Sequence, residues 1–279
     1  MPAKKKHETF FIFIDGKWLV AGYPFFALIY LATIQADMRS KDKNRFSIYV
    51  AVAIILLINL AFNCIAQDSS AISPPVTNNW KLYKKQVDQD STKKMVELRS
   101  LMRDIIYDLR YAGTNNFMQR MMYPSNTTET FLRLPAAIAL SKVQKELNEK
   151  GLGLKIFDAY RPYSVTVKFW ELVKDERYVA NPAKGSGHNR GIAVDLTIIN
   201  LNTGEELAMG TSFDNFTDTA HHSFTNLPEE VLQNRLLLKS VMEKKGFKAL
   251  ETEWWHYFLA DGNRFELLDF DFKKLKNQL

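Results

Sequence analysis

Cysteine is almost absent from this chain of 279 residues, because Cys64 is the only one. A disulfide within the chain is therefore excluded, and any metal site after residue 64 must use nitrogen and oxygen ligands. Histidine is scarce as well, since residues 67 to 279 contain only His188, His221, His222 and His256. A metal site in this part of the chain would have to draw on these histidines.

A large excess of charge of one sign is also missing from most of the chain. The whole sequence has 37 Lys and Arg against 31 Asp and Glu. Residues 1 to 66 hold eight of the basic residues and four of the acidic ones, so residues 67 to 279 carry a formal net charge of only +2. Basic side chains form no stripe with interleaved aromatic residues, so we expect no nucleic-acid partner.

Apolar runs long enough for a membrane-spanning helix, about 20 residues, are lacking too. Residues 48 to 61, IYVAVAIILLINLA, follow a basic segment and precede small residues near Ala66. This order of basic, apolar and small residues is typical of a secretory signal, with cleavage expected before Gln67. We therefore interpret residues 1 to 66 as an N-terminal hydrophobic leader.

Three other interpretations of the leader stay open. A second apolar stretch at residues 18 to 34 would suit an uncleaved membrane anchor, which would attach the protein to a membrane. Translation could begin at Met38, which would leave an ordinary signal peptide, and Cys64 could carry a lipid. Each alternative places the rest of the chain outside the cytoplasm, either in the periplasm or facing it from a membrane.

The rest of the chain divides into a polar lead-in and one domain. Residues 67 to 95 are polar, contain a Pro-Pro pair and show no sustained period, so we expect a linker there. Helical and strand patterns then alternate without a regular βαβ order, which predicts a single α+β domain over residues 96 to 279. The predicted strands cover residues 105–112, 152–160, 192–200 and 247–259, and the predicted helices cover 134–151, 164–173 and 228–246.

Asp195 lies in the middle of an apolar strand pattern, IAVDLTIIN. A carboxylate in such a place is costly unless a positive group meets it. Arg190 and a metal ion are the candidate partners. His188 lies in a glycine-rich turn seven residues before Asp195, where it is free to fold back toward the strand.

A second acid-and-histidine pair occurs in ETEWWHYF, where Glu253 precedes His256 by three residues. Two histidines and one carboxylate would leave the fourth position of a tetrahedral zinc ion to water, and the second acid could serve as a general base. The spacing does not decide whether Asp195 or Glu253 is the ligand. Because residues three apart face opposite sides of a flat strand, Glu253 and His256 need a bulge or twist to converge.

Arg161 follows a predicted strand and precedes Pro162 in FDAYRPYSV. The fixed backbone angle of the proline would hold the guanidinium rigidly, so Arg161 could stabilise an oxyanion during attack on a carbonyl. A surface arginine in a turn remains the alternative.

Five motifs together carry a resemblance to a known family. They are DLRYAGTNNF (108–117), DAYRP (158–162), SGHNRGIAVD (186–195), MGTSFDNF (209–216) and EWWH (253–256). In this order they resemble the zinc D-alanyl-D-alanine dipeptidases of the VanX type, in the D-Ala-D-Ala metallopeptidase group, peptidase family M15. The resemblance implies an α+β domain with a central antiparallel sheet flanked by helices.

The resemblance also implies roles for particular residues. Those that would bind one zinc ion per chain are His188, Asp195 and His256. Glu253 would be the catalytic base, and Arg161 would stabilise the transition state. The positions that match the family's substrate pocket are Asp214, Ser186 and Tyr111.

The activity that the resemblance implies is direct hydrolysis of the dipeptide D-alanyl-D-alanine in the turnover of cell-wall peptides. Glu253 would take a proton from water and return it to the leaving amine, without a covalent intermediate. Asp214 would pair with the free amino terminus of the substrate, although it could instead cap a turn.

Two alternatives remain. One is a zinc D,D-carboxypeptidase or endopeptidase that acts on peptidoglycan stem peptides. The other is a zinc-stabilised wall-binding module without catalysis, and the presence of Glu253 and Arg161 argues against that module.

Overall fold

The computed structural model describes residues 10–14, 17–21 and 75–279. The chain divides into two compact units, Met1–Ala71 and Ile72–Leu279. In the first unit, β1 (Phe10–Ile14) and β2 (Lys17–Ala21) pair in antiparallel fashion. The rest of the predicted leader, including the apolar segment 48–61, lies outside the described residues. Within the described part of the chain, no helix is both long enough and apolar enough to cross a membrane.

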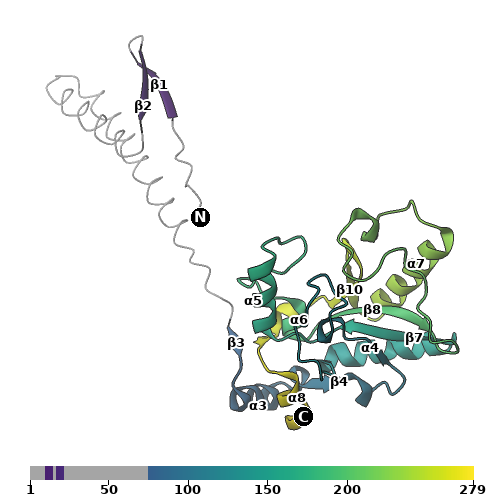
Figure 1. Cartoon of the computed structure of the whole chain (residues 1–279). Helices are drawn as coiled ribbons and strands as arrows, with labels where there is room; N and C mark the ends of the chain where they lie inside the picture. The colour runs from purple at the N-terminus through teal and green to yellow at the C-terminus, as the bar shows by residue number, and fades with distance from the viewer. Residues whose placement is uncertain (1–9, 15–16, 22–74) are drawn as a thin grey trace, which may run out of the picture. The chain divides into compact units, whose positions relative to one another are not determined.

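A five-stranded sheet forms the centre of the second unit (Figure 1). Its order is β5, β7, β8, β10 and β9, and the strands cover Ile106–Tyr107, Leu152–Asp158, Ala193–Asn200, Glu253–Leu259 and Phe247–Leu250 respectively. Antiparallel pairs join β7 to β8, β8 to β10 and β10 to β9, whereas β5 pairs with β7 in parallel. The sheet is therefore mixed, and the prediction of an antiparallel sheet is wrong at the β5 edge. The long connection from β5 to β7 contains α4, and such a crossover lets β7 return in parallel beside β5.

Two helices cover one face of this sheet. Helix α4 (Leu134–Asn148) lies against β7, and α7 (Glu229–Lys244) lies against β9 and β10; the two helices also contact each other. Pro135 stands in the first turn of α4, where its missing amide hydrogen is not needed. The remaining elements are β3 (Val76–Thr77), α3 (Trp80–Gln89), β4 (Met95–Glu97), β6 (Phe131–Arg133), α5 (Tyr163–Leu172), α6 (Gly187–Arg190), β11 (Leu267–Leu268) and α8 (Phe272–Gln278).

The alternation of side chains along β8 explains the buried carboxylate. Val194, Leu196 and Ile198 are fully buried on one face of the strand, the face that α4 and α7 cover. Asp195 therefore faces the opposite side of the sheet. His256 of β10 is its direct partner across the antiparallel ladder, so the two side chains share that second face.

The predicted strand over residues 247–259 is in fact two strands. β9 and β10 form an antiparallel pair joined by a turn at residues 251 and 252. The pairing shifts register between Glu253 and Tyr257, which is the irregularity that the spacing of Glu253 and His256 required. The expectation of a bulge is confirmed.

Residues 76 to 95 are folded, although the sequence predicted a linker over 67–95. β3 pairs with β11, and Tyr83 of α3 is buried in the main core. The hydroxyl of Tyr83 accepts a 2.7 Å hydrogen bond from the amide of Met95, which anchors the segment further. The prediction of a linker is wrong for this part because long-range contacts, rather than a local period, order it.

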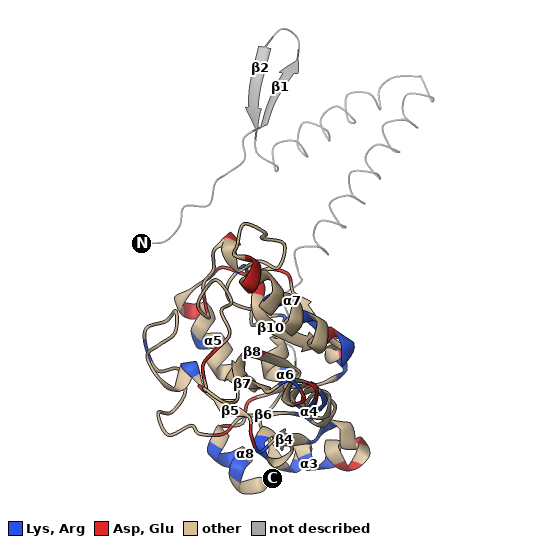
Figure 2. Ribbon diagram, turned by 90° about the vertical axis from the view of Figure 1, so that its right-hand side faces the viewer, with Lys and Arg blue, Asp and Glu red and all other residues tan. Residues whose placement is uncertain are grey.

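Charged residues on the second unit are mixed in sign. Figure 2 shows basic ribbon segments on α3 and α8 near the C-terminus, with acidic segments nearby. Several of these side chains form ion pairs, including Lys93 with Glu266 and Lys276 with Glu129. The charge of this end is therefore partly neutralised by local partners.

Candidate active site

His188 is held by the short helix α6. Ser186 caps the start of the helix, and its hydroxyl accepts a 3.1 Å hydrogen bond from the amide of His188; Gly191 caps the end with a left-handed φ of 69°. The ring Nδ1 lies 2.7 Å from the carbonyl oxygen of Ala159. Because a carbonyl can only accept, Nδ1 must carry the hydrogen, which leaves the Nε2 lone pair free for a ligand.

His188, Asp195 and His256 converge on one point of the open sheet face. Nε2 of His188 lies 3.3 Å from Nδ1 of His256, and Oδ1 of Asp195 lies 2.8 Å from the same Nδ1. The three candidate ligand atoms lie within 4.8 Å of one another, and His188 and Asp195 are buried. Burial alone would raise the pKa of Asp195, but His188 and His256 hold it below its usual range.

The donor set fits a metal ion of zinc's size and ligand preference. Zinc–nitrogen bonds of about 2.0–2.1 Å place two ligand atoms of a tetrahedron about 3.3 Å apart. The separation of the two imidazole nitrogens, 3.3 Å, matches that value. The hydrogen bond from His188 to the Ala159 carbonyl is the kind of outer contact that orients a metal-binding histidine.

Glu253 lies beside this cluster. Its Oε2 is 4.0 Å from Nδ1 of His256, although the two residues are separated by three positions along the strand. Burial, together with the charge of Asp195, raises the pKa of Glu253 to about 7, against the lowering influence of His256. A carboxyl group with a pKa near neutrality can both accept and donate a proton, as a general acid–base catalyst must.

Arg161 is fixed from three sides. Its Nε and Nη2 donate hydrogen bonds of 3.0 and 2.7 Å to Oδ2 of Asp158, and its guanidinium lies against the rings of Tyr111 and Phe169. Asp158 is fully buried and also accepts a 2.7 Å hydrogen bond from the hydroxyl of Tyr123. The guanidinium is therefore rigid, whereas the sequence alone allowed a surface arginine.

Asp158 is a site residue that the sequence analysis missed. It lies within the motif DAYRP, three residues before Arg161, and ends a strand pattern in which a buried carboxylate needs a partner. That position was the available signal, because the same argument identified Asp195.

Asp214 lies in a loop with a left-handed φ of 61°, which is uncommon for a residue other than glycine. Its carboxylate accepts hydrogen bonds from the hydroxyl of Tyr111 at 3.2 Å and from the amide of Phe117 at 3.3 Å. Burial, together with the nearby charge of Asp195, raises its pKa to about 8. Tyr111 links this carboxylate to Arg161, so the two parts of the site share one tyrosine.

All eight residues that the sequence singled out line one cavity of about 260 Å³. They are Tyr111, Arg161, Ser186, His188, Asp195, Asp214, Glu253 and His256. The aromatic rings of Phe117, Phe169 and Phe216 are among the other lining groups. The cavity is smaller than the about 300–1,000 Å³ of pockets for drug-sized ligands, so it suits a small molecule.

His221 and His222 lie outside this lining. The amide of His222 donates a 2.9 Å hydrogen bond to the carbonyl of Glu251, and burial lowers the pKa of the His222 ring to about 4. Neither histidine therefore contributes a lining group to the candidate site.

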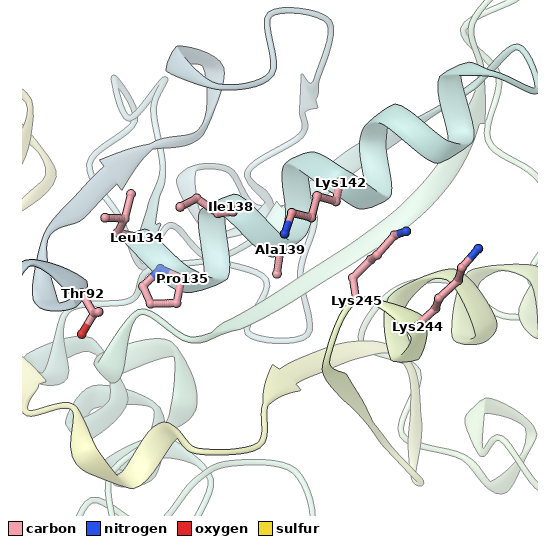
Figure 3. Close-up of a pocket in the computed structure, with 8 residues that line it drawn as sticks. All are labelled: Thr92, Leu134, Pro135, Ile138, Ala139, Lys142, Lys244 and Lys245. Atoms are coloured by element: carbon pink, nitrogen blue, oxygen red, sulfur yellow. The ribbon is translucent and has the colours of Figure 1, made fainter.

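A larger hollow of about 470 Å³ lies between the start of α4 and the end of α7 (Figure 3). Apolar groups of Leu134, Pro135 and Ile138 form part of its lining, and Lys142, Lys244 and Lys245 extend along it. No acid, histidine or cysteine lines it, so it offers no set of side chains that could hold a metal ion. The chemistry of the lining, rather than the size, assigns the candidate active site to the smaller cavity.

Comparison with known proteins gives the family. Residues 91–274 match peptidase family M15, described as D-ala-D-ala dipeptidase. The D-alanyl-D-alanine dipeptidase of Escherichia coli (strain K12) is 33% identical over 177 residues, which cover 63% of this chain and 90% of that protein. The D-alanyl-D-alanine dipeptidase of Enterococcus faecalis is 31% identical over 182 residues, or 59% and 90% of the two chains. That of Streptomyces coelicolor is 32% identical over 181 residues, or 58% and 89%. The matched region contains all eight of the site residues that the sequence singled out, and the chain therefore belongs to peptidase family M15, the D-Ala-D-Ala dipeptidases, and is a peptidase.

Proposed function

We propose that this peptidase hydrolyses D-alanyl-D-alanine to two molecules of D-alanine, with one zinc ion held by His188, Asp195 and His256. The observation that carries the proposal is the position of Glu253, 4.0 Å from His256 in a cavity of about 260 Å³. A general base, a metal-ligand cluster and a closely fixed arginine then surround a space of about the size that a dipeptide needs.

The bound metal would supply Lewis acidity, which polarises the scissile carbonyl and makes water a better nucleophile near neutral pH. In the protein itself, Glu253 takes the proton from the attacking water and later delivers it to the nitrogen of the leaving amine. A pKa near 7 suits both transfers, because the same carboxyl must be deprotonated first and protonated afterward.

Arg161 meets the negative charge that develops on the carbonyl oxygen during attack. Its Nε and Nη2 are committed to Asp158, while no hydrogen bond from Nη1 occurs among residues 75 to 279. Because the guanidinium is already fixed by Asp158, Tyr111 and Phe169, little reorganisation accompanies the reaction.

Asp214 binds the amino group of the substrate in this proposal. Its pKa is raised to about 8, so a nearby ammonium group would favour the ionised carboxylate and gain an ion pair. An interaction with a free amino terminus selects short substrates. In a peptide extended at its amino end, the corresponding nitrogen is part of an uncharged amide bond and cannot form the ion pair with Asp214. The size of the cavity also favours a dipeptide over a stem peptide.

The proposal is tested with the zinc-loaded protein, by measuring alanine released from D-Ala-D-Ala, L-Ala-L-Ala and a stem pentapeptide. We expect release from the D-dipeptide, and in Glu253→Gln we expect a fall of about 10²–10⁴-fold with zinc content unchanged. Glu251→Gln is the matched control, because Glu251 lies at the preceding turn and its carboxylate accepts a hydrogen bond from the Ser223 amide, away from the cavity lining. That control variant should retain the wild-type rate.

Two results would contradict the proposal. Cleavage of the pentapeptide alone would show that the substrate is a wall peptide rather than the free dipeptide. Zinc-loaded protein that cleaves none of the three substrates would favour a binding module.

For the biological setting, we propose turnover of wall-derived dipeptides outside the cytoplasm. The support is the signal-like order of basic, apolar and small residues at positions 39 to 66. Fractionation of cells that produce the full chain tests this part, and recovery of the protein in the cytosol would contradict it.

A further inference from the structure

Arg235 lies in α7 and is 5% exposed, yet the catalytic chemistry described above makes no use of it. Its three side-chain nitrogens all donate to backbone carbonyls. Nε donates to Met209 at 2.8 Å, Nη2 to Thr219 at 2.9 Å and Nη1 to His221 at 3.1 Å. One guanidinium therefore joins both ends of the segment that runs from residue 209 to residue 221.

Asp214 lies in the middle of that segment. Its left-handed φ of 61° is a conformation that the surroundings must maintain, because a non-glycine side chain disfavours it. Within the loop, Thr211 accepts a 2.8 Å hydrogen bond from the indole nitrogen of Trp254, and the Phe213 ring packs 4.9 Å from that of Phe157. These contacts hold the N-terminal half of the loop, whereas Arg235 is the group that ties its two ends together.

We propose that Arg235 is a positioning residue for substrate recognition. It holds the loop so that Asp214 presents its carboxylate to the amino group of the substrate, and this inference rests on the proposed function. Arginine suits the task because its planar, forked donors reach several carbonyls at once in a fixed geometry, whereas lysine offers one compact ammonium group.

The first test compares Arg235→Lys with wild type in the full chain, using D-Ala-D-Ala as the substrate. We expect KM to rise about tenfold, the change expected from one weakened hydrogen bond to a charged group, with kcat nearly unchanged. A rise in KM alone marks lost binding rather than lost catalysis. Lys239→Gln is the control, since Lys239 lies one turn further along α7 in an exposed ion pair with Glu243, and its KM should stay at the wild-type value.

A double-mutant cycle distinguishes positioning from a general effect on the fold. If Arg235 acts through Asp214, Arg235→Lys should raise KM in the wild-type background and change it little in the Asp214→Asn background. If Arg235→Lys raises KM by the same factor in the wild-type and Asp214→Asn backgrounds, the inference is overturned. A fall in kcat with KM unchanged would also overturn it.

Gly210→Ala provides a second variant in case Arg235→Lys folds poorly. Gly210 has a φ of 81°, and a Cβ there would lie 2.9 Å from Cγ1 of Val231 and 3.0 Å from Cδ2 of Leu227. The substitution should push the loop away from α7 without changing the arginine. It should reproduce the rise in KM and lose that effect in the Asp214→Asn background.

Limited proteolysis with chymotrypsin measures the loop without any substrate. Phe213 and Phe216 are the residues of the loop that chymotrypsin can recognise, and cutting there should be faster in Arg235→Lys than in wild type or Lys239→Gln. Unchanged cutting would overturn the inference. If Asp214→Asn leaves KM unchanged while cutting is faster, then the proposed role of Asp214 fails and Arg235 retains only its role in holding the loop.

Discussion

Single carboxylates dominate the chemistry of this site; Asp195 and Asp158 are buried, Asp214 is half-buried, and each meets a different environment. Asp195 faces two histidines, Asp158 faces Arg161, and Asp214 faces only a tyrosine hydroxyl and one amide. The pKa follows these partners, since it falls for Asp195 and rises to about 8 for Asp214. An acid with so few compensating partners is suited to bind a cationic group, which is the role that we propose for Asp214.

Asp214→Asn should stabilise the metal-free protein at high pH. Because the pKa of Asp214 rises from 3.8 to about 8 on folding, the folded protein keeps a proton that the unfolded chain releases. Its contribution to stability is complete below the unfolded pKa and is lost as pH rises through the folded pKa. An asparagine, which also tolerates a left-handed φ, lacks this dependence.

The melting temperature of chelator-treated protein measures the effect between pH 4 and 9. We expect Asp214→Asn to become more stable relative to wild type as pH rises. At pH 9 the difference in the free energy of unfolding should reach at least about 1.4 kcal/mol, or about 3–6 °C in melting temperature. A difference in melting temperature that does not change with pH would contradict this expectation.

Short irregular elements, rather than the long regular ones, place the functional groups. Helix α6 has only four residues and presents His188, and the register shift in β10 brings Glu253 beside His256. Such elements have little intrinsic stability, because a single helical turn forms few hydrogen bonds for the residues that it orders. They depend on caps and packing, and α6 uses Ser186 at its start and Gly191 at its end.

Gly191→Ala should therefore disturb the metal site. A Cβ at this position would lie 2.9 Å from both Cε and Sδ of Met95, and the φ of 69° disfavours alanine. We expect a loss of about 1–3 kcal/mol in the free energy of unfolding and weaker retention of zinc after dialysis, because His188 would move with the helix end.

Gly204→Ala is the matched control for this prediction. Gly204 has a similar φ of 73°, but nothing lies within 4 Å of its added Cβ. The free energy of unfolding of Gly204→Ala should fall only by the cost of placing alanine at a positive φ, and the zinc content of this variant should not change. Equal zinc retention in the two variants would contradict the assigned role of Gly191.

At the scale of the whole molecule, the peptidase domain begins well before the predicted start at residue 96. The hydroxyl of Tyr83 accepts from the Met95 amide, and the buried Arg133 donates to the carbonyl of Lys93. Arg133 also donates to the carbonyls of Arg190 and Glu266, so it joins the lead-in segment to the region around α6. The segment from residue 76 to 95 is therefore part of the support for the site.

Two truncations test this boundary. A chain of residues 72 to 279 should unfold cooperatively and retain dipeptidase activity, since these residues form one compact unit. For a chain of residues 96 to 279, we expect the free energy of unfolding to be lower by more than about 4 kcal/mol than for residues 72 to 279. The reason is that Tyr83 is then missing from the core and Arg133 loses a buried acceptor. Circular dichroism on heating measures the melting temperatures of both truncated chains. Equal melting temperatures would show that residues 76 to 95 act as a linker and do not stabilise the domain.

Much of the local structure follows from sequence pattern. The helix predicted over 134–151 occurs as α4 and the one over 228–246 as α7, because their apolar spacing, first-turn residues and closing glycines are all local signals. The strand around Asp195 was predictable for the same reason. Short elements such as β3 and β5, each two residues long, leave no period to detect.

The sequence by itself determined the family and the chemical groups available: nitrogen and oxygen ligands, one strand aspartate, one strand glutamate and an arginine before a proline. Only the tertiary structure decided which groups meet. His188 reaches His256 across 68 positions because α6 ends beside β8 and β8 pairs with β10. Arg235 was identified only there, because its hydrogen bonds to a distant loop have no period in the sequence.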